Sequence, residues 1–596
     1  TTALGQRTRF EYDALNQLRK VTDPLGGQTQ LSYDPNGNLL SLTDARSSVT
    51  SYAYNSMDRA TTRTDPLLRP ESYGYDSNGN PTALTDRKGQ QTSRAYDTLD
   101  RLTQLSYQDG STTAFTWDAG NRLTQIVDSL AGTIIRGYDM LDRLIQEVTP
   151  QGTVSYTYDA AGRRTSLTVL GQPTLGYTYD TADRLTQITQ GAATVTLAYD
   201  PAGRRTSLSL PNGVSTEYAW DAASRLTGLT YKNGPNVLGT LIYSYDAGGN
   251  RTLLNGTWAR TGLPPALTAA TYNAANQQVA VGGQALTYDL NGNLTSDGTT
   301  TYTWDARDRL VTLTGPGGTA SFDYDPLGRR PSKSINGTAT SFLYDGLNPV
   351  QEQQGGSPVA NLLTGLGIDE YLTRTDAAGT QAFLTDALGS TIALTDAAGT
   401  VPTSYTYEPF GHTTLIGATT TNAFEYTGRE NDGTGLYYYR ARYYHPRFQR
   451  FLSEDPIGFN SGVNFYAYAR NDPLRWVDPY GLDVTISKWK CCIGFDHVGI
   501  AVNSRDTVGF YPEHPGHLFD RGIVVDDLAR KAPNELKDLF TIDTTPEQDA
   551  RIQAYIEQRR ANPGNYNLLT GRHCGGFVQG ALRAGGISPF GDVAAP

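Results

Sequence analysis

The chain has 596 residues, more than one compact domain normally holds unless it is built from a repeat that adds core as it lengthens. Its 63 glycines and 38 tyrosines, against only 2 methionines, are typical of many turns and aromatic-bearing strands. The net charge of −11 argues against a nucleic-acid-coating surface, because phosphate binding needs clustered Lys and Arg. No apolar run of about 18 residues occurs, so we expect no membrane span.

A repeat runs through the first part of the chain. Its unit reads Tyr-Asp-x-x-(Gly/Asp/Asn)-(Arg/Asn)-(Arg/Leu)-Thr-x-(Leu/Ile), and it recurs at a spacing of 21 residues. The aromatic anchors at this spacing are Tyr12, Tyr33, Tyr54, Tyr75, Tyr96, Trp117 and Tyr138. Further copies continue at similar intervals as far as Tyr344.

Each repeat predicts a β-hairpin. In 184–200, two runs rich in Thr, Val and Tyr alternate in the way that suits half-buried strands. The Asp-x-x-Gly and Asp-Pro-x-Gly segments fit type I turns. One hairpin cannot bury its apolar face alone, so we expect neighbouring hairpins to form a long antiparallel sheet with a constant twist. Periodicity allows either a spiral around a cavity or a plain structural array.

The Tyr-Asp units resemble the YD repeats of Rhs proteins and of the shell subunits of tripartite insecticidal toxins. A denser match, 385–482, is similar to the Rhs-associated core. It contains Thr-Asp-Ala-Leu-Gly-Ser (385–390), Tyr-Glu-Pro-Phe-Gly (407–411), Tyr-Thr-Gly-Arg-Glu (426–430), Gly-Leu-Tyr-Tyr-Tyr-Arg-Ala-Arg-Tyr-Tyr (435–444), Arg-Phe-Leu-Ser-Glu-Asp-Pro-Ile-Gly (450–458), Asn-Phe-Tyr-Ala-Tyr (464–468) and Asp-Pro-Tyr-Gly-Leu (478–482).

The resemblance implies a mainly β fold, in which a spiralling antiparallel YD-repeat sheet forms a hollow shell around a C-terminal toxin. We therefore divide the chain into a YD-repeat shell (1–380), a core with a self-cleavage motif (381–482) and a C-terminal toxin domain (483–596). The resemblance also implies an N-terminal module that caps the shell. Because the chain lacks an initiator Met and a signal peptide, we expect that module to precede residue 1 in a longer protein.

The same resemblance implies aspartic self-cleavage between Leu482 and Asp483. Asp455 and Asp478, each opening an Asp-Pro-x-Gly motif, would form the dyad. Two carboxyls held close cannot both ionise, so one stays protonated as the acid while the other activates water. The motif also occurs at other places in the chain, where it is simply a turn, and that interpretation is open for both aspartates. The other places are Asp23, Asp34, Asp200 and Asp325.

Two residues depart from the family pattern without touching the presumed dyad. Phe459 stands where Leu is commoner, and His445 stands where the family often has Asp.

After Leu482 the Tyr-Asp units stop and helical patterns begin. Residues 483–596 contain 12 Lys and Arg against 14 Asp and Glu, a net charge of −2, whereas a nuclease would usually be more basic. Two adjacent cysteines, Cys491 and Cys492, match no common zinc spacing and imply no disulfide, so we expect no metal and no cofactor.

Two segments of this region predict thiol chemistry. The stretch 496–502 alternates as a strand that places His497 beside small residues. The stretch 571–582 reads as a helix that begins near Cys574, where the helix dipole and free N–H groups lower a thiol pKa. His497 would then be the general base. Taken singly, each residue also fits an ordinary core position.

A histidine-bearing strand followed by a helix that begins at a cysteine resembles the arrangement in the permuted papain-like enzymes. These include NlpC-type peptidases and lecithin:retinol-acyltransferase-like proteins. The matches are 497–502 and 574–578, and His573 stands where Asn is usual. The resemblance implies a small α+β papain-like domain. For the third polar residue we prefer His514 over Glu513 and His517.

We therefore expect a polymorphic toxin whose shell releases a Cys–His peptidase, amidase, deamidase or acyltransferase. The family implies a cognate immunity protein, secretion-system delivery components, synthesis in the bacterial cytoplasm and delivery into target cells. We expect no nucleic-acid partner. The alternatives are the same shell with a non-thiol toxin such as a nuclease, or a structural or adhesive carbohydrate-binding surface protein.

Overall fold

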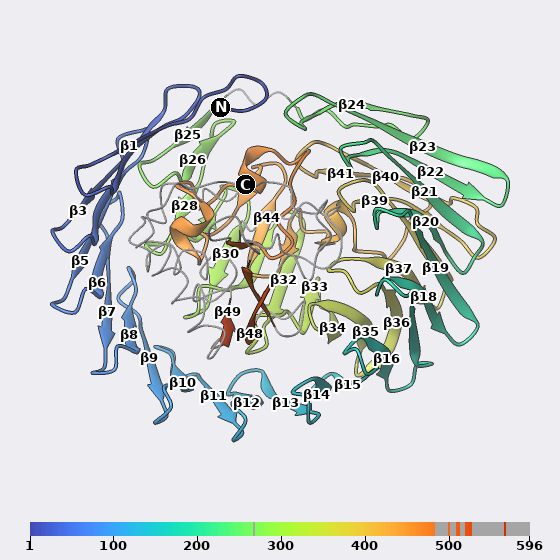
Figure 1. Ribbon diagram of the computed structural model, residues 1–596, viewed down its shortest axis with the longest axis horizontal. Coiled ribbons are helices and arrows are strands. Elements are labelled where there is room, and N and C mark those ends of the chain that lie inside the picture. The colour runs from blue at the N-terminus through green and yellow to red at the C-terminus, as the bar shows by residue number, and fades with distance from the viewer. Residues whose placement is uncertain (266–268, 483–498, 501–507, 513–518, 527–564, 568–596) are drawn as a thin grey trace. The chain divides into compact units, whose positions relative to one another are not determined.

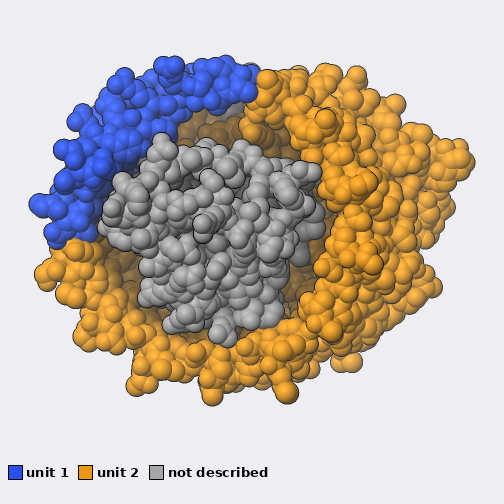
Figure 2. All heavy atoms as spheres, in the orientation of Figure 1, with its two compact units in different colours: residues 1–49, 493–596 blue, residues 50–492 orange. Residues whose placement is uncertain are grey.

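The computed structural model describes residues 1–265, 269–482, 499–500, 508–512, 519–526 and 565–567. They form two compact units, residues 1–49 with 493–596, and residues 50–492 (Figure 2). Within the described ranges, regular structure consists of antiparallel strands and three short 3-10 helices. None of the described helices is long and apolar enough to cross a membrane.

The first strands belong to residues 1–49. They pair in sequence order and follow the 21-residue repeat. They are β1 (Arg9–Tyr12), β2 (Leu18–Thr22), β3 (Gln28–Tyr33) and β4 (Leu39–Thr43).

Strands β5 to β24 form one continuous antiparallel meander, which we call the repeat wall. Figure 1 shows these strands following one another along a curved path. They are β5 (Val49–Tyr54), β6 (Ala60–Thr64), β7 (Pro70–Tyr75), β8 (Pro81–Thr85), β9 (Gln91–Tyr96), β10 (Leu102–Ser106), β11 (Thr112–Trp117), β12 (Leu123–Asp128), β13 (Gly132–Tyr138), β14 (Leu144–Thr149), β15 (Gly152–Tyr158), β16 (Arg164–Val169), β17 (Leu175–Tyr179), β18 (Leu185–Gln190), β19 (Ala193–Tyr199), β20 (Arg205–Ser209), β21 (Val214–Trp220), β22 (Leu226–Asn233), β23 (Asn236–Tyr245) and β24 (Arg251–Asn255). The predicted hairpin repeat is confirmed.

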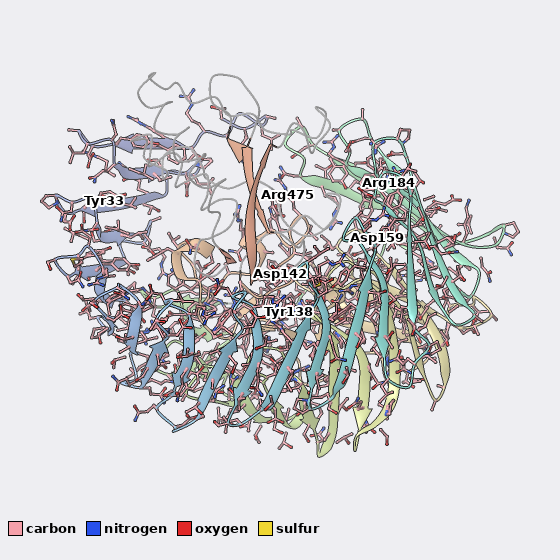
Figure 3. All side chains as sticks on the ribbon, turned by 60° about the horizontal axis from the view of Figure 1, so that its bottom comes forward. Tyr33, Tyr138, Asp142, Asp159, Arg184 and Arg475 are labelled. Atoms are coloured by element: carbon pink, nitrogen blue, oxygen red, sulfur yellow. The ribbon has the colours of Figure 1, made fainter. Side chains whose placement is uncertain are left out.

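The Asp that follows each aromatic anchor organises the turn. Asp139 Oδ1 accepts hydrogen bonds from the backbone N–H groups of Leu141 (2.9 Å) and Arg143 (3.0 Å). Its Oδ2 accepts another from Arg143 Nε at 2.7 Å. Asp142 adopts a left-handed φ of 61°, which explains why Gly, Asn and Asp recur at this position. Figure 3 labels Tyr138 and Asp142 at this turn.

The Arg of each repeat also holds the next repeat. Arg143 Nη1 donates to the backbone oxygen of Asp159 at 2.9 Å. Its guanidinium lies 4.9 Å from the ring centroid of Tyr158, whose hydroxyl donates to the Leu144 oxygen at 2.7 Å. The Tyr, Asp and Arg of the repeat are therefore the residues that fasten successive hairpins together.

A second sheet, β28 to β41, pairs in sequence order in the same way. Its strands are β28 (Thr287–Tyr288), β29 (Leu294–Ser296), β30 (Thr301–Trp304), β31 (Leu310–Gly315), β32 (Gly318–Asp323), β33 (Ser332–Ile335), β34 (Thr338–Asp345), β35 (Asn348–Gln354), β36 (Ser357–Thr364), β37 (Tyr371–Asp376), β38 (Gly379–Thr385), β39 (Thr391–Thr395), β40 (Thr403–Tyr407) and β41 (Thr413–Gly417). A small sheet precedes it, formed by β25 (Ala270–Tyr272), β26 (Gln278–Val281) and β27 (Gln284–Ala285).

The repeat wall and the second sheet share a hydrophobic core. Val195 and Leu229 of the wall belong to the same buried cluster as Leu343 and Leu384 of the second sheet. Ion pairs also cross between the sheets. These are Arg307–Asp128 (2.6 Å), Arg329–Glu147 (2.6 Å), Arg164–Asp345 (2.6 Å) and Arg205–Glu370 (2.7 Å).

Residues 424–482, which we call the closing segment, contain little regular structure but most of the largest fully buried aromatic side chains of the described chain. Its elements are η1 (Tyr426–Gly428), β42 (Glu430–Asn431), β43 (Tyr437–Tyr439), β44 (Arg442–His445), β45 (Arg450–Phe451), η2 (Gly458–Ser461) and η3 (Ala469–Asn471). Tyr439, Tyr444 and Tyr468 are fully buried in one cluster. A buried scaffold of this kind can fix side chains precisely enough for chemistry.

Beyond residue 482 the described residues are four strands that pair in order. They are β46 (Gly499–Ile500), β47 (Val508–Pro512), β48 (Phe519–Asp526) and β49 (Asn565–Asn567). Strand β46 falls within the stretch predicted to be a strand. The helix predicted within 571–582 lies outside the described residues, as do His497, His514 and Cys574. The papain-like domain therefore stays a prediction.

Candidate active site

Asp455 and Asp478 are both buried in the closing segment. Asp455 follows β45 and is 4% exposed, and Asp478 follows η3 and is 0% exposed. Asp455 Oδ1 accepts from the backbone N–H of Ile457 at 3.0 Å, and its backbone oxygen accepts from Gly458 at 3.0 Å. Asp455 therefore forms a turn within its own motif, and its second carboxyl oxygen, Oδ2, lies close to a different side chain.

That side chain is Arg442, which brings the two aspartates together. Arg442 Nη2 lies 2.7 Å from Asp455 Oδ2 and 3.4 Å from Asp478 Oδ2. The guanidinium carbon lies 3.6 Å from the ring centroid of Phe451. Two carboxyls from separate Asp-Pro-x-Gly motifs thus meet one nitrogen of a buried guanidinium.

The sequence reasoning missed Arg442. A usable signal was present, because Arg442 belongs to a tyrosine-rich run, 435–444, that reads as buried strands. A guanidinium in such a run needs buried carboxylate partners, and the two flanking Asp-Pro motifs supply them.

The electrostatics of the site raise the pKa of the Asp455 carboxyl. Burial raises the pKa of Asp455 to about 6, although Arg442 opposes the rise, and the nearby Asp478 adds to it. A carboxyl with such a pKa can donate a proton near neutral pH, as a general acid must.

The residues just before the predicted cleavage point are held in place. The backbone N–H of Ala441 donates to the Tyr480 oxygen at 3.1 Å, and Arg440 Nη1 donates to the Pro479 oxygen. Arg442 Nε donates to the Gly481 oxygen at 2.5 Å. The strand hairpin that carries Arg442 therefore also grips the chain that leads to Leu482.

Leu482 contacts one of the two aspartates, Asp478. Its backbone N–H donates to Asp478 Oδ1 at 3.1 Å, and the residue is 8% exposed. Gly481 has a φ of 66°, and a Cβ there would lie 2.2 Å from the Tyr439 oxygen, so only glycine fits. Asp483 lies outside the described residues.

The two departures from the family pattern are structural. Phe459 packs edge-on against Phe465, with ring centroids 5.0 Å apart. His445 stacks on Phe448, with ring centroids 3.8 Å apart, and burial lowers the His445 pKa to about 4, so its ring is neutral.

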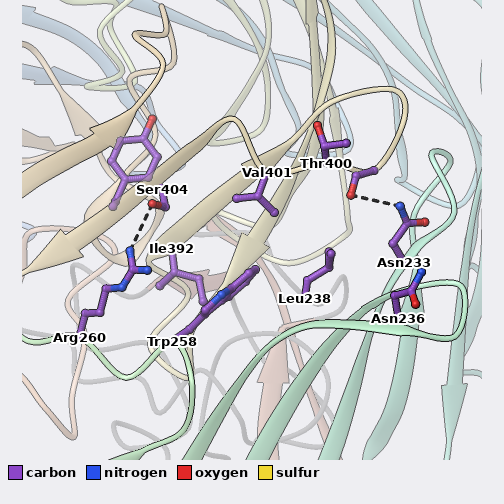
Figure 4. Close-up of a pocket in the computed structure, with 11 residues that line it drawn as sticks. Asn233, Asn236, Leu238, Trp258, Arg260, Ile392, Thr400, Val401 and Ser404 are labelled. Atoms are coloured by element: carbon purple, nitrogen blue, oxygen red, sulfur yellow. Dashed lines mark hydrogen bonds between the residues drawn. The ribbon is translucent and has the colours of Figure 1, made fainter.

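A pocket of about 490 Å³ lies elsewhere, between the β22–β23 hairpin and the second sheet (Figure 4). Polar groups at its rim already pair with one another. Arg260 Nη1 donates to Ser404 Oγ at 3.5 Å, and Asn233 Nδ2 donates to the Gly399 oxygen at 3.3 Å. No residue of the dyad lines this pocket. The described ranges hold no group of three or more His, Cys, Asp or Glu side chains arranged for a metal ion.

Family models match most of the described chain. The Teneurin YD-shell model matches residues 208–474. The RHS Repeat model matches residues 1–28, 33–67, 75–111, 96–133 and 138–171.

Two curated relatives are bacterial toxins or nucleases by name. The tRNA3(Ser)-specific nuclease WapA of Bacillus spizizenii is 35% identical over 257 residues, 41% of this chain and 11% of that protein. Double-stranded DNA deaminase toxin A of Burkholderia cenocepacia is 32% identical over 238 residues, 33% of this chain and 16% of that protein. The chain thus spans only a small part of the length of these relatives.

Among solved structures, the TcdB2–TccC3–Cdc42 crystal structure shares the fold. The TM-score is 0.58 at 18% identity, over 80% of this chain and 34% of that chain. The predicted antiparallel YD-repeat architecture is therefore confirmed.

Proposed function

The chain is an Rhs/YD-repeat protein related to bacterial toxins, and on this premise we propose that its shell encloses a toxin domain, residues 483–596, and releases it by cutting the Leu482–Asp483 bond. The observation that supports this proposal is the contact of Arg442 with both Asp455 and Asp478, one of which binds the Leu482 backbone.

The cleavage is a hydrolysis shared between two carboxyls. Asp478 takes a proton from a water molecule as the water oxygen bonds to the Leu482 carbonyl carbon. Asp455, whose pKa is raised to about 6, gives its proton to the Asp483 nitrogen as the C–N bond breaks. The products are a carboxyl group on Leu482 and a free amino group on Asp483. Arg442 keeps the two carboxyls adjacent and offsets part of their charge.

A denaturing gel of the purified chain tests the proposal. Scaling the 64.7 kDa mass by length gives expected fragments of about 52 and about 12 kDa. Asp455→Asn or Asp478→Asn should leave one band. Asp200→Asn, in a wall turn with the same Asp-Pro-x-Gly motif, should still be cut. One band from the natural chain would instead support the structural or adhesive alternative.

The rate of cleavage should depend on pH. Because the proposed acid is protonated below a pKa of about 6, the rate should fall as the pH rises above that value. We expect cleavage at pH 8 to be roughly 10- to 100-fold slower than at pH 6, with an apparent pKa that belongs to the pair of carboxyls. The measurement is the time course of the two fragments when uncut chain, newly made by a pulse of cell-free synthesis, is shifted to each pH. A rate that rises with pH would contradict the assignment of Asp455 as the acid.

For the released domain we propose a thiol enzyme, a peptidase, amidase, deamidase or acyltransferase. His497, oriented by His514, would take the proton of the Cys574 thiol, and the thiolate would attack a carbonyl carbon. The same proton would then pass from His497 to the leaving group as its bond to that carbon breaks. The acyl group would then pass to water or another acceptor. Cys574→Ala should abolish toxicity when residues 483–596 are expressed in bacteria, while Cys491→Ala should not.

A second candidate for the released domain is a nucleic-acid-directed enzyme. It is favoured by the names of the relatives, a tRNA nuclease and a double-stranded DNA deaminase. Undiminished killing by Cys574→Ala, with loss of intact tRNA or mutated DNA in the poisoned cells, would establish it over the thiol enzyme.

Either activity requires partners. We propose an immunity protein that protects the producing cell, and a secretion machine that delivers the protein from the bacterial cytoplasm where it is made. Both follow from the relationship to toxins rather than from a surface of this chain.

A further inference from the structure

One turn of the repeat wall reaches the residue next to Asp455. Arg87 lies in the turn between β8 and β9, and its guanidinium binds both carboxyl oxygens of Glu454. The distances are 2.9 Å from Nη1 to Oε1 and 2.8 Å from Nη2 to Oε2. Both side chains are largely buried, 6% and 12% exposed. The two residues are 367 positions apart in the chain, so this contact forms only when the wall meets the closing segment.

Further ion pairs surround the Arg87–Glu454 contact. Arg87 Nη1 also lies 3.0 Å from Asp65 Oδ2 of a neighbouring wall turn. The next residue, Lys88, binds Asp308 of the second sheet, with Nζ 3.0 Å from Oδ1. A buried fork of this kind fixes its carboxylate partner in both direction and distance.

A second wall residue, Arg63, contacts Phe465, whose backbone oxygen binds the backbone N–H of Asp455. Arg63 of β6 lies over the ring of Phe465, 5.2 Å from its centroid. The Phe465 backbone oxygen accepts from the Asp455 N–H at 3.0 Å and from Arg442 Nη1 at 2.8 Å. Two wall residues therefore contact the neighbourhood of Asp455. Arg87 binds Glu454, the residue before it, and Arg63 packs on Phe465, which binds both the Asp455 backbone and Arg442.

We propose that Arg87 is a positioning residue for self-cleavage: by holding Glu454, it sets Asp455 against Arg442, so the chain is cut only after this part of the wall has docked. The inference rests on the proposed self-cleavage. Docking of residues 60–90 on the closing segment would then precede the release of the toxin domain. In this order, the toxin domain stays covalently attached until the Arg87–Glu454 contact has formed.

The test follows cleavage of the full chain after a labelled pulse of cell-free synthesis, read on denaturing gels. Arg87→Gln and Glu454→Gln should each slow cleavage roughly 10- to 100-fold, because a small displacement of a catalytic group has effects of this size. The double variant should be no slower than the slower of the two single variants, since both remove the Arg87–Glu454 contact. Arg87→Lys, which keeps the charge, should recover part of the rate.

Arg205→Gln is the matched control. Arg205 also joins the wall to the second sheet through a glutamate, Glu370, at 2.7 Å, but it makes no contact with the dyad. It should cleave at the natural rate, and resistance to trypsin should show that each variant is folded. If Arg87→Gln is not resistant to trypsin, the cleavage rates of Glu454→Gln and Arg87→Lys test the inference in its place.

Equal rates for the natural chain and the folded Arg87 or Glu454 variants would overturn this inference, as would equal slowing by Arg205→Gln. In those cases the proposed function would stand if Asp455→Asn still blocked cleavage. A natural chain that stays as one band would overturn both proposals.

Discussion

The repeat wall and the closing segment use the same residue types, Tyr, Asp and Arg, in opposite environments. In the wall, a pair such as Arg122–Asp118 remains partly exposed, 29% and 24%. In the closing segment, the Arg442 side chain is 1% exposed, and the side chains of Asp455 and Asp478 are 0% and 1% exposed. Exposed pairs contribute little and can recur in every repeat, whereas buried ones must be matched to their partners.

The tyrosines differ in the same way. Tyr158 of the wall is half-buried and donates to a backbone oxygen one strand away. Tyr439 and Tyr468 are fully buried, and their hydroxyls bond to each other at 3.0 Å. The wall repeats one local contact many times, and the closing segment forms a single packed cluster. Damage should therefore be tolerated in the wall and poorly tolerated in the closing segment.

The largest effect should come from Arg330, which is fully buried between the second sheet and the closing segment. It binds Glu430 at 2.6 Å and Asp432 at 2.5 Å. Arg330→Met would leave the two buried carboxylates with Lys333 as their remaining charged partner, at 3.5 Å from Glu430 and 3.0 Å from Asp432. We expect a loss of about 3–5 kcal/mol in the free energy of unfolding, measured by urea denaturation. Arg122→Met in the wall should leave the midpoint of urea unfolding nearly unchanged, because water screens this partly exposed pair. Similar losses in the two variants would remove the distinction between the regions.

An intermediate effect should come from Glu147. It lies in the wall, but like the charged residues of the closing segment it is buried and paired with arginines. Burial by itself would raise its pKa, but Arg329 and Arg136 outweigh burial and lower the pKa to about 2. The stabilisation is therefore present above the usual pKa of 4.5 and is lost as the pH falls through about 2. The shift corresponds to roughly 3 kcal/mol, which Glu147→Gln should lose at pH 7.

The check on Glu147 is urea denaturation of both proteins at pH 7 and at pH 3. The natural chain should lose more stability between these values than Glu147→Gln does. Equal losses would mean that the two arginines do not hold the carboxylate ionised.

The smallest effect should come from a wall turn. Leu68 has a left-handed φ of 64° and is 83% exposed, so its side chain contributes strain but little burial. Leu68→Gly should raise the midpoint of thermal unfolding, with a gain of about 1 kcal/mol. Leu141→Gly, at an exposed turn position without positive φ, should give no gain. If both variants raise the midpoint of thermal unfolding, the gain comes from removing an exposed apolar side chain and not from relief of backbone strain.

Much of the wall was predictable because its contacts are local. Asp139 caps its own turn within four residues, and the positive φ of Asp142 explains the recurring Gly, Asn and Asp. The pairing of Asp455 with Asp478 was expected only from a family resemblance. Arg442 was missed, because no local pattern says which carboxylates a buried guanidinium will meet.

The sequence by itself determined the period, the strands, the turns and the two Asp-Pro motifs, because these depend on hydrogen bonds between residues close in the chain. Only the tertiary structure decided that Arg442 touches both aspartates and that Arg87 of the wall grips Glu454. Those contacts join residues that are far apart in the chain, and the packing of the sheets, rather than any local preference, brings their charges within reach.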